Sequence, residues 1–195
     1  WFEVFSPTPS EPIYGVSMVN STHGFAAGES GRIMHWDGVE WSDHITPTGN
    51  RLNSVAMITA SDGWIVGVNG NLLRYNGSAW VPYEQASSAD YTAVDLFSST
   101  LGFSVGLGGV IVRWGGSVWG PMTSPTGDDL YGVSMISATD GFAVGEGKRI
   151  VRWDGNDWTT FTSPGGPPRT FRDVSMVNSS DGFIVDDTGR IYRWN

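Results

Sequence analysis

Short apolar runs, each ended within a few residues by glycine, aspartate or proline, follow one another along the whole chain. The pattern is clearest between residues 129 and 164, which contain apolar runs at 130–136, 142–144, 150–153 and 158–162. The first run alternates between two sets of side chains, and the third is rich in β-branched and aromatic residues. Asp154-Gly155 separates the third run from the fourth, and such a pair between two runs is a strong hairpin signal. The pattern therefore predicts four antiparallel strands.

This segment is one of five similar copies. Its Gly141-Phe142 pair recurs with spacings of 39, 39, 39 and 41 residues, as Gly24-Phe25, Gly63-Trp64, Gly102-Phe103 and Gly182-Phe183. Four antiparallel strands in about 40 residues are typical of one propeller blade, which must stack on its neighbours to bury its faces. We therefore predict an all-β, five-bladed β-propeller with four antiparallel strands per blade. No long 3.6-residue periodicity appears, so almost no helix is expected.

The repeat boundaries predict one domain over residues 1–195. The blades are expected at about 13–50, 51–89, 90–128, 129–169 and, for blade 5, 170–195 plus 1–12. The composite fifth blade follows from two features: the last copy stops at its third strand, and Trp1 matches the residues that begin the fourth strands, Trp41, Trp80, Trp119 and Trp158. Residues 1–6 are thus predicted to pair with residues 190–195 and to close the propeller, because an open array would leave strand edges exposed.

Alignment of the copies places the predicted core in recurring columns. These are Val16, Val55, Val94, Val133 and Val174, then Met18, Met57, Leu96, Met135 and Met176, then Phe25, Trp64, Phe103, Phe142 and Phe183, and finally Ile33, Leu72, Ile111, Ile150 and Ile191. The columns are expected between blades, and Trp64 and Phe142 in particular are expected to be buried. A glycine column, Gly28, Gly67, Gly106 and Gly145, changes to Asp186 in the last copy and predicts a turn or a close backbone approach.

Charge and cysteine content narrow the classes of partner. The net charge of −9 argues against nucleic acid, whose phosphates require clustered lysine and arginine, and against anionic membrane surfaces. No apolar run is long enough to span a membrane, so no membrane insertion is expected within this segment. The chain has no cysteine, which excludes disulfides, thiol chemistry and cysteine-based zinc sites.

A second set of columns is polar. His35 and four arginines stand directly before an aromatic residue in each copy. One hypothesis is a ligand site on each blade, built from Arg74, Arg113, Arg152, Arg193, Trp36, Trp114, Trp153 and Trp194. The structural alternative is that each guanidinium stacks on a neighbouring ring and pairs with a nearby carboxylate.

The other polar residues give little support for catalysis or for a metal. The acidic column His23, Asp62, Leu101, Asp140 and Asp181 is a turn position, and the three histidines lack ligand spacing. The carboxylates are dispersed, so no catalytic residue, metal or cofactor is predicted. Asn20, Asn76 and Asn178 fit the N-glycosylation pattern in predicted turns, which favours an extracellular or cell-surface protein.

The unit Asp-Gly-Phe-Ala-Val-Gly, followed by Gly-x-Ile-x-Arg-Trp-Asp-Gly-x-x-Trp, resembles the Asp-box (BNR-type) repeats. It is most similar to those of photosystem II assembly-factor propellers and of exported archaeal and bacterial proteins. Asp37, Asn76 and Asp154 match the polar turn position of that hairpin, whereas Gly115 does not. The resemblance implies a propeller fold. The arginine triad of the family's sialidases has no counterpart here, so sialidase activity is not implied.

These observations favour a non-enzymatic binding or assembly module of an exported or cell-surface protein, a rigid scaffold for a protein partner or for self-assembly. The first alternative is a lectin with one shallow glycan site per blade, in which indole faces pack on sugar rings. The second is a glycoside hydrolase, which would need two carboxylates that face each other across the axis.

Overall fold

A computed structural model describes residues 11–84 and 86–195 of the chain. It divides into two compact units, residues 1–90 and residues 91–195, which are described separately. The described residues form nineteen strands and four short 3-10 turns, and contain no α-helix. The prediction of an all-β chain with almost no helix is confirmed.

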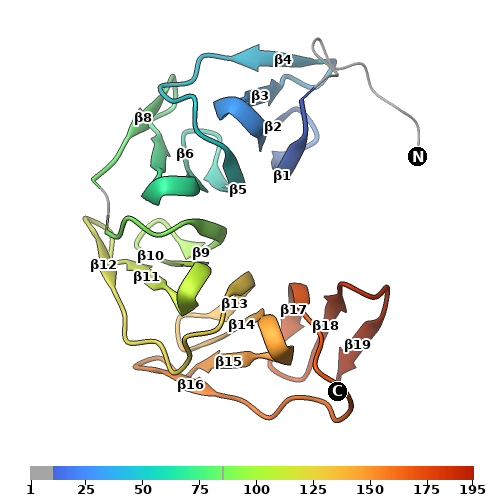
Figure 1. The fold of residues 1–195 in the computed structure, drawn as a ribbon. Coiled ribbons are helices and arrows are strands. Elements are labelled where there is room, and N and C mark those ends of the chain that lie inside the picture. The colour runs from blue at the N-terminus through green and yellow to red at the C-terminus, as the bar shows by residue number, and fades with distance from the viewer. Residues whose placement is uncertain (1–10, 85) are drawn as a thin grey trace. The chain divides into compact units, whose positions relative to one another are not determined.

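Unit 1 contains two four-stranded antiparallel sheets (Figure 1). The first consists of β1 (Ile13–Asn20), β2 (His23–Gly28), β3 (Ile33–Trp36) and β4 (Trp41–His44). The second consists of β5 (Leu52–Thr59), β6 (Asp62–Gly67), β7 (Leu72–Tyr75) and β8 (Trp80–Pro82). A 3-10 turn joins the second strand to the third in each sheet, as η1 (Glu29–Gly31) and η2 (Val68–Gly70).

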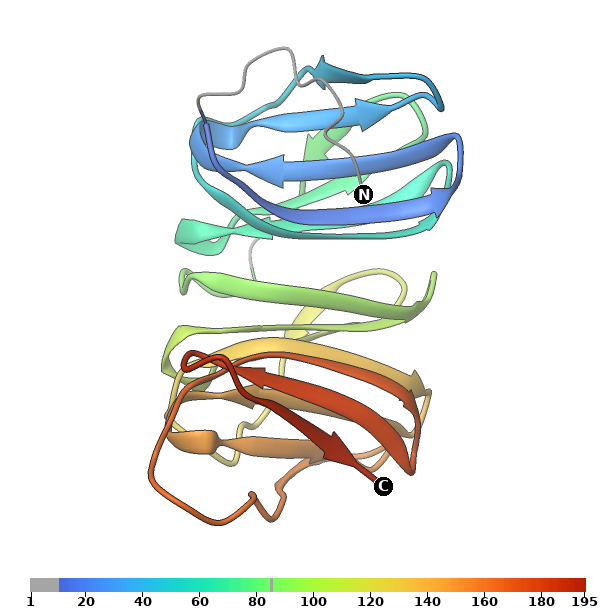
Figure 2. The same cartoon turned by 90° about the vertical axis from the view of Figure 1, so that its right-hand side faces the viewer.

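Unit 2 contains two further four-stranded sheets and a three-stranded one, whose antiparallel strands are red in Figure 2. The first two consist of β9 (Tyr91–Ser98), β10 (Leu101–Gly106), β11 (Ile111–Trp114) and β12 (Trp119–Pro121), and of β13 (Leu130–Ser137), β14 (Asp140–Gly145), β15 (Ile150–Trp153) and β16 (Trp158–Thr160). The third consists of β17 (Phe171–Asn178), β18 (Asp181–Asp186) and β19 (Ile191–Trp194). Their 3-10 turns are η3 (Leu107–Gly109) and η4 (Glu146–Lys148).

The hairpins between third and fourth strands form as their turn residues predict. The side-chain oxygen of Asp154 accepts hydrogen bonds of 2.9 Å from the amides of Asn156 and Asp157, while Gly155 adopts a φ of +99°. Asp37 and Asn76 bond the amides of their own hairpins in the same way. The polar turn residue therefore fixes the loop locally, and glycine supplies the left-handed conformation.

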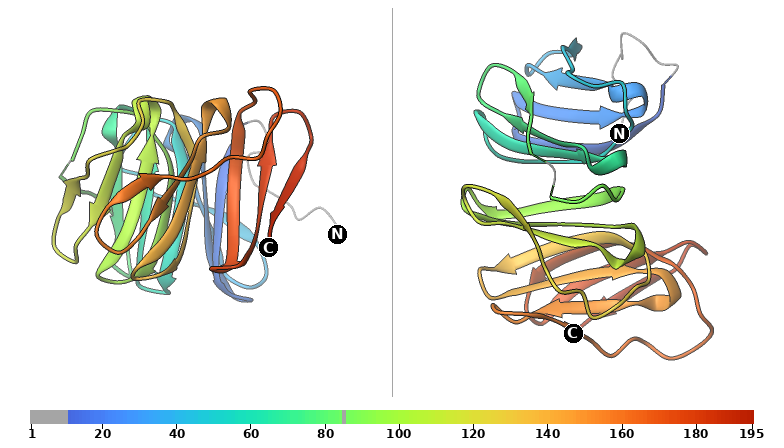
Figure 3. Two further views of the ribbon diagram at one scale, coloured as in Figure 1. Left: turned by 90° about the horizontal axis from the view of Figure 1, so that it is seen from below. Right: turned by 60° about the vertical axis from the view of Figure 1, so that its left-hand side comes forward.

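Within each unit, the first strand of a sheet packs on the face of the preceding sheet, as the unit 2 sheets in Figure 3 illustrate. One hydrogen bond recurs at this contact. The amide of Met57 donates to Ser17 Oγ (3.0 Å), that of Met135 to Asp95 Oδ2 (2.7 Å), and that of Met176 to Ser134 Oγ (3.1 Å). The acceptors occupy one column of the repeat, so a single side-chain oxygen sets the register between two stacked sheets.

The glycine column marks a close backbone approach, as predicted. A Cβ atom on Gly28 would lie 2.2 Å from the carbonyl oxygen of Pro12, and one on Gly145 would lie 1.9 Å from that of Asp129. In the last copy Asp186 occupies this place. Its carboxylate accepts bonds from the amides of Thr188 and Arg190 and from the hydroxyl of Tyr192.

The predicted core columns are buried where one sheet of a unit stacks on another. Trp64 and Phe142 are buried, as predicted. Val16 and Met18 in the first sheet, and Phe183 and Ile191 in the last, are exposed within their own units, so their burial at a closed ring stays a prediction. These side chains belong to the correct columns, but they lie on sheet faces with no further sheet of their own unit stacked on them.

The predicted strand pattern of four per repeat is confirmed in four sheets. The fourth strand of the last sheet was predicted from residues 1–6, which lie outside the described residues, so terminal closure stays a prediction.

Candidate functional site

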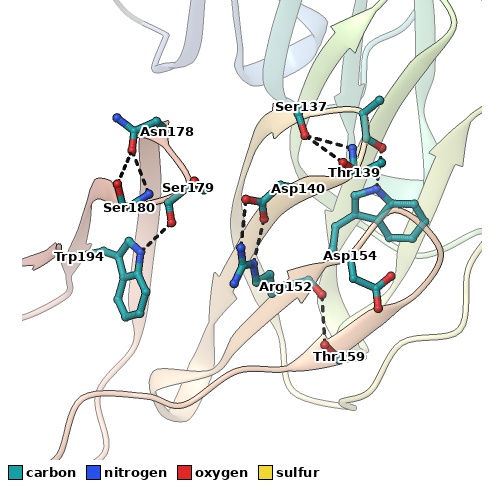
Figure 4. Close-up of polar contacts among 12 residues, drawn as sticks. Ser137, Thr139, Asp140, Arg152, Asp154, Thr159, Asn178, Ser179, Ser180 and Trp194 are labelled. Atoms are coloured by element: carbon teal, nitrogen blue, oxygen red, sulfur yellow. Dashed lines mark hydrogen bonds and ion pairs between the residues drawn. The ribbon is translucent and has the colours of Figure 1, made fainter.

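Three of the four predicted arginines form an ion pair with the acidic column. The pairs join Arg74 to Asp62 (3.1 Å), Arg152 to Asp140 (2.9 Å) and Arg193 to Asp181 (3.1 Å). The register explains the recurrence: Arg152 lies opposite Phe142, and Asp140 is two residues before it on the same face of β14 (Figure 4). The Arg152 guanidinium lies 5.2 Å from the ring of Phe142, and its bonds to Asp140 raise its pKa.

The remaining copies vary this arrangement. In the third copy Leu101 stands where three other copies have the aspartate partner of the arginine. The guanidinium of Arg113 in this copy lies 6.0 Å from the ring of Trp153. In the first sheet histidines replace both partners, and Nδ1 of His23 lies 3.0 Å from Nε2 of His35. Burial, followed by the nearby His23 and His44, lowers the pKa of His35.

The predicted indoles differ in how much of each ring is accessible. Each one donates a hydrogen bond from Nε1 to a backbone carbonyl of the first hairpin of its own sheet; the acceptors of Trp36, Trp114, Trp153 and Trp194 are Ser21, Ser99, Ala138 and Ser179. Trp114 and Trp153 are buried, whereas Trp36 is partly exposed and Trp194 is 40% exposed. A ligand therefore has access to the ring of Trp36 or Trp194, but not to the two buried rings.

A polar cleft of about 420 Å³ adjoins the Arg152 pair in unit 2. Arg152, Asp140, Asp154, Thr139 and Thr159 line it (Figure 4). The two carboxylates already accept bonds from Arg152 and from the hairpin amides. The cleft can offer hydroxyls and guanidinium edges to a polar ligand, but it lacks a carboxylic acid placed to exchange a proton.

A tyrosine, an arginine and a carboxylate cluster together at one strand position in each unit. In unit 1, Tyr14 donates a 2.8 Å hydrogen bond to Glu29, and the Arg51 guanidinium lies 5.5 Å from the tyrosine ring. The hydrogen bond to Glu29, followed by burial, raises the pKa of Tyr14. We call this group the Tyr14 cluster.

In unit 2, Tyr131 donates a 3.1 Å bond to Asp129, and Arg172 lies 4.9 Å above its ring. Burial, followed by the bond to Asp129, raises the pKa of Tyr131. We call this group the Tyr131 cluster. Sequence reasoning missed both clusters, although Tyr14 and Tyr131 share one column of the repeat and this recurrence was a signal that could have found them.

An apolar groove of about 400 Å³ lies beside the last sheet of unit 2. Phe142, Phe161, Met176, Phe183 and Trp194 are among the residues that line it. The ring of Phe161 lies edge-on to Phe142 at 5.4 Å and to Trp194 at 5.3 Å between centroids. The groove thus has aromatic walls along β19.

Two carboxylates are buried on first strands of unit 2. Burial raises the pKa of Asp95 although the amides of Met135 and Leu96 bond it, and burial also raises the pKa of Asp173. Across the described ranges no three His, Cys, Asp or Glu side chains come together as a metal site. No helix of the described chain is long and apolar enough to cross a membrane.

The architecture is that of known β-propellers. The chain matches the WD40 propeller domain of Doa1 at 14% identity and a TM-score of 0.78, covering 94% of this chain and 65% of that one. It matches YCF48 bound to D1 peptide at 17% identity and a TM-score of 0.73, covering 97% and 64%, and U3-55K at 11% identity and a TM-score of 0.83, again covering 97% and 64%.

These likenesses establish that the repeated sheets are propeller blades. The chain spans slightly less than two thirds of the length of those three structures. No protein-family model matches the sequence, and no curated protein matches it.

Proposed function

We propose that the chain is a non-enzymatic protein-interaction scaffold that contacts its partner through the Tyr14 and Tyr131 clusters. The observation that carries this is that two first strands place a tyrosine at the same position of the repeat. Each tyrosine bonds a carboxylate and lies beside an arginine, although these partners come from different positions of the repeat. Tyrosine and arginine, together with tryptophan, are enriched among the residues that dominate binding energy at protein interfaces. The structurally similar YCF48 was solved with a peptide of D1, which supports a polypeptide as the ligand class.

The geometry of each cluster suits recognition of a polar segment. The hydrogen bond to the carboxylate and the overlying guanidinium hold the tyrosine ring in one orientation, which lowers the entropy lost on binding. The arginine keeps donors for a carbonyl or carboxylate of the partner. No step of this recognition needs a proton transfer or a metal.

The test is a selection of linear peptides on the purified protein, followed by affinity measurements on variants. Tyr131→Ala and Arg172→Ala should each weaken the selected ligands at least ten-fold. Val118→Ala, on an exposed hairpin, should leave their affinity unchanged. Ligands that bind both cluster variants as tightly as the original protein would contradict the proposal. A chain that selects no peptide but binds one glycan class on an array would support the lectin alternative.

We also propose that the protein is exported or displayed on a cell surface. The three glycosylation sequences lie in exposed turns that begin at Asn20, Asn76 and Asn178. In each turn the residue two positions later donates hydrogen bonds from both its amide and its hydroxyl to the asparagine Oδ1. Secretory expression in a eukaryotic host should give a product whose mass falls on N-glycosidase treatment. Replacing all three asparagines with glutamine should remove that mass difference, and an unglycosylated secreted product would contradict acceptor function at these turns.

A further inference from the structure

Two positions of the repeat that carry an ion pair in other sheets carry histidines in the first sheet. In the second sheet the pair joins Asp62 to Arg74 at 3.1 Å. In the first sheet Nδ1 of His23 lies 3.0 Å from Nε2 of His35, and these two residues are also 12 positions apart. The same register therefore places two imidazole nitrogens together where the second sheet joins a carboxylate to a guanidinium. A neutral imidazole offers a lone pair, so both residues are of the type that binds metals.

The two imidazole rings are held against a buried phenylalanine inside unit 1. His35 on β3 lies opposite Phe25 on β2, and His23 precedes Phe25 by two residues on the same face of the strand. The centroid of the Phe25 ring lies 5.4 Å from that of His23 and 4.9 Å from that of His35. Tyr75 and Trp80 of the second sheet also pack on Phe25, at 4.8 and 5.2 Å. The contact between the two sheets thus positions both histidines before any ligand binds.

The separation of the two nitrogens fits one edge of a metal coordination shell. Imidazole nitrogens bind zinc at about 2.0–2.1 Å, so two of them at an angle of about 90–110° around the ion lie about 2.8–3.4 Å apart. The 3.0 Å between His23 Nδ1 and His35 Nε2 lies within this range. A bound ion would replace the proton that the two nitrogens share, because each ligand must present its lone pair to the metal.

The surroundings of the pair favour one class of cation. Both histidine side chains are partly exposed, so water and dissolved ions reach them. The net charge of −9 raises the concentration of cations near the protein. Imidazole suits copper, nickel and zinc, whereas calcium and magnesium take oxygen ligands. A divalent transition metal is therefore the ion that this pair of donors selects.

We propose that Nδ1 of His23 and Nε2 of His35 together bind one divalent transition-metal ion of the copper, nickel and zinc group. Water completes the coordination, because no third His, Cys, Asp or Glu side chain of the described ranges joins the pair as a ligand. The affinity should follow the usual order for nitrogen ligands, with Cu²⁺ above Ni²⁺ and Zn²⁺. The site shares no residue with the Tyr14 and Tyr131 clusters, and it goes beyond the scaffold function proposed above.

The third histidine of the chain provides an internal control. His44 on β4 also packs on Phe25, with 5.6 Å between the ring centroids. Its Nδ1 lies 3.1 Å from the carbonyl oxygen of Ile45, to which it donates a hydrogen bond. His44 thus belongs to the same aromatic packing without being a member of the histidine pair.

The experiment titrates the metal-free protein, without a polyhistidine tag, with Cu²⁺, Zn²⁺ and Mg²⁺ in a calorimeter. The original protein should bind one Cu²⁺ and, more weakly, one Zn²⁺, and should not respond to Mg²⁺. Electron paramagnetic resonance of the Cu²⁺ form should show coupling to two imidazole nitrogens. His23→Asp/His35→Arg, which copies the pair of the second sheet, and His35→Gln should each lower the Cu²⁺ affinity at least ten-fold. His44→Gln should leave it unchanged.

Three results would overturn the proposal. The first is a protein that binds neither Cu²⁺ nor Zn²⁺. The second is equal Cu²⁺ binding by the original protein and both pair variants, which would place the ion elsewhere on the acidic surface. The third is a His44→Gln variant that loses as much affinity as His35→Gln, which would assign a different set of ligands.

Two further measures keep the test decisive. Circular dichroism of each metal-free variant shows whether it is folded, and His35→Gln replaces the double variant if the latter does not fold. The peptide selection that tests the scaffold function is carried out with a metal chelator present. Failure of metal binding therefore leaves the test of the Tyr131 cluster intact, and failure of peptide binding leaves the metal site intact.

Discussion

The ammonium group of Lys148 donates a 2.8 Å hydrogen bond to the carbonyl of Gly165 and a 3.2 Å bond to that of Pro164. Lys148 is the only lysine in the chain, and it is buried with a φ of +63° where the other copies have glycine. The repeat spacing here is 41 residues instead of 39, and the additional residues lie in the loop that follows Pro164. The buried side chain therefore supports the longer loop.

Lys148→Gly should destabilise the protein by about 1–2 kcal/mol. The variant loses charge-assisted hydrogen bonds, which lowers the free energy of unfolding. It also removes the strain of a left-handed backbone at a non-glycine residue, which offsets part of that loss. Deletion of Gly165 and Gly166 in the same variant restores the common spacing and should recover most of the loss. Urea unfolding measures both effects, and a Lys148→Gly variant with the long loop and full stability would contradict this account.

The His23–His35 pair should make unit 1 sensitive to mild acid. The folded protein lowers the pKa of His35, so the unfolded chain binds a proton more readily and stability falls as the pH drops from about 6.5, the usual histidine pKa. The double variant His23→Asp/His35→Arg copies the Asp62–Arg74 pair of the second sheet and should flatten this dependence between pH 7 and 5. The test is the melting temperature of the original protein and of the double variant between pH 7 and 5. If both melting temperatures fall by the same amount, groups other than this histidine pair cause the acid sensitivity.

Asp186 should contribute stability that is lost at low pH. Its burial favours the neutral carboxyl, but the hydrogen bonds from Arg190, Thr188 and Tyr192 outweigh burial and hold the pKa well below the usual aspartate range. The contribution is complete above the ordinary aspartate pKa of about 4 and disappears as the pH falls below it. Asp186→Gly introduces the glycine that the other copies have at this position. The variant should be less stable than the original protein at pH 7. The difference between the two unfolding free energies should narrow towards pH 2, and a constant difference would refute the electrostatic explanation.

Phe142→Ala should cost about 3–5 kcal/mol, the usual loss for a buried aromatic. Phe142 is 4% exposed and packs with Val144, Ile150 and Phe171. Phe183→Ala is the matched control, because Phe183 occupies the same column but is 43% exposed, and its loss should be below about 2 kcal/mol. Denaturant titration compares the two, and equal losses would show that exposure does not determine the cost.

Much of the fold followed from the sequence because its determinants are local. Alternating side chains predicted the strands, and a polar residue before glycine predicted the hairpins at Asp37, Asn76 and Asp154, which form by bonding their own amides. The five copies reinforced each prediction. The ion pairs were also within reach, since each aspartate precedes its arginine by 12 residues in three copies.

The tertiary structure decided which members of a column are accessible. Val16 and Val55 share one place in the repeat, as do Phe142 and Phe183, yet one of each pair is buried and the other exposed. The local sequence fixes which way a side chain points from its strand. Whether water reaches it depends on a second sheet stacked on that face. Residues about 40 positions away form that sheet, and no local pattern encodes the contact.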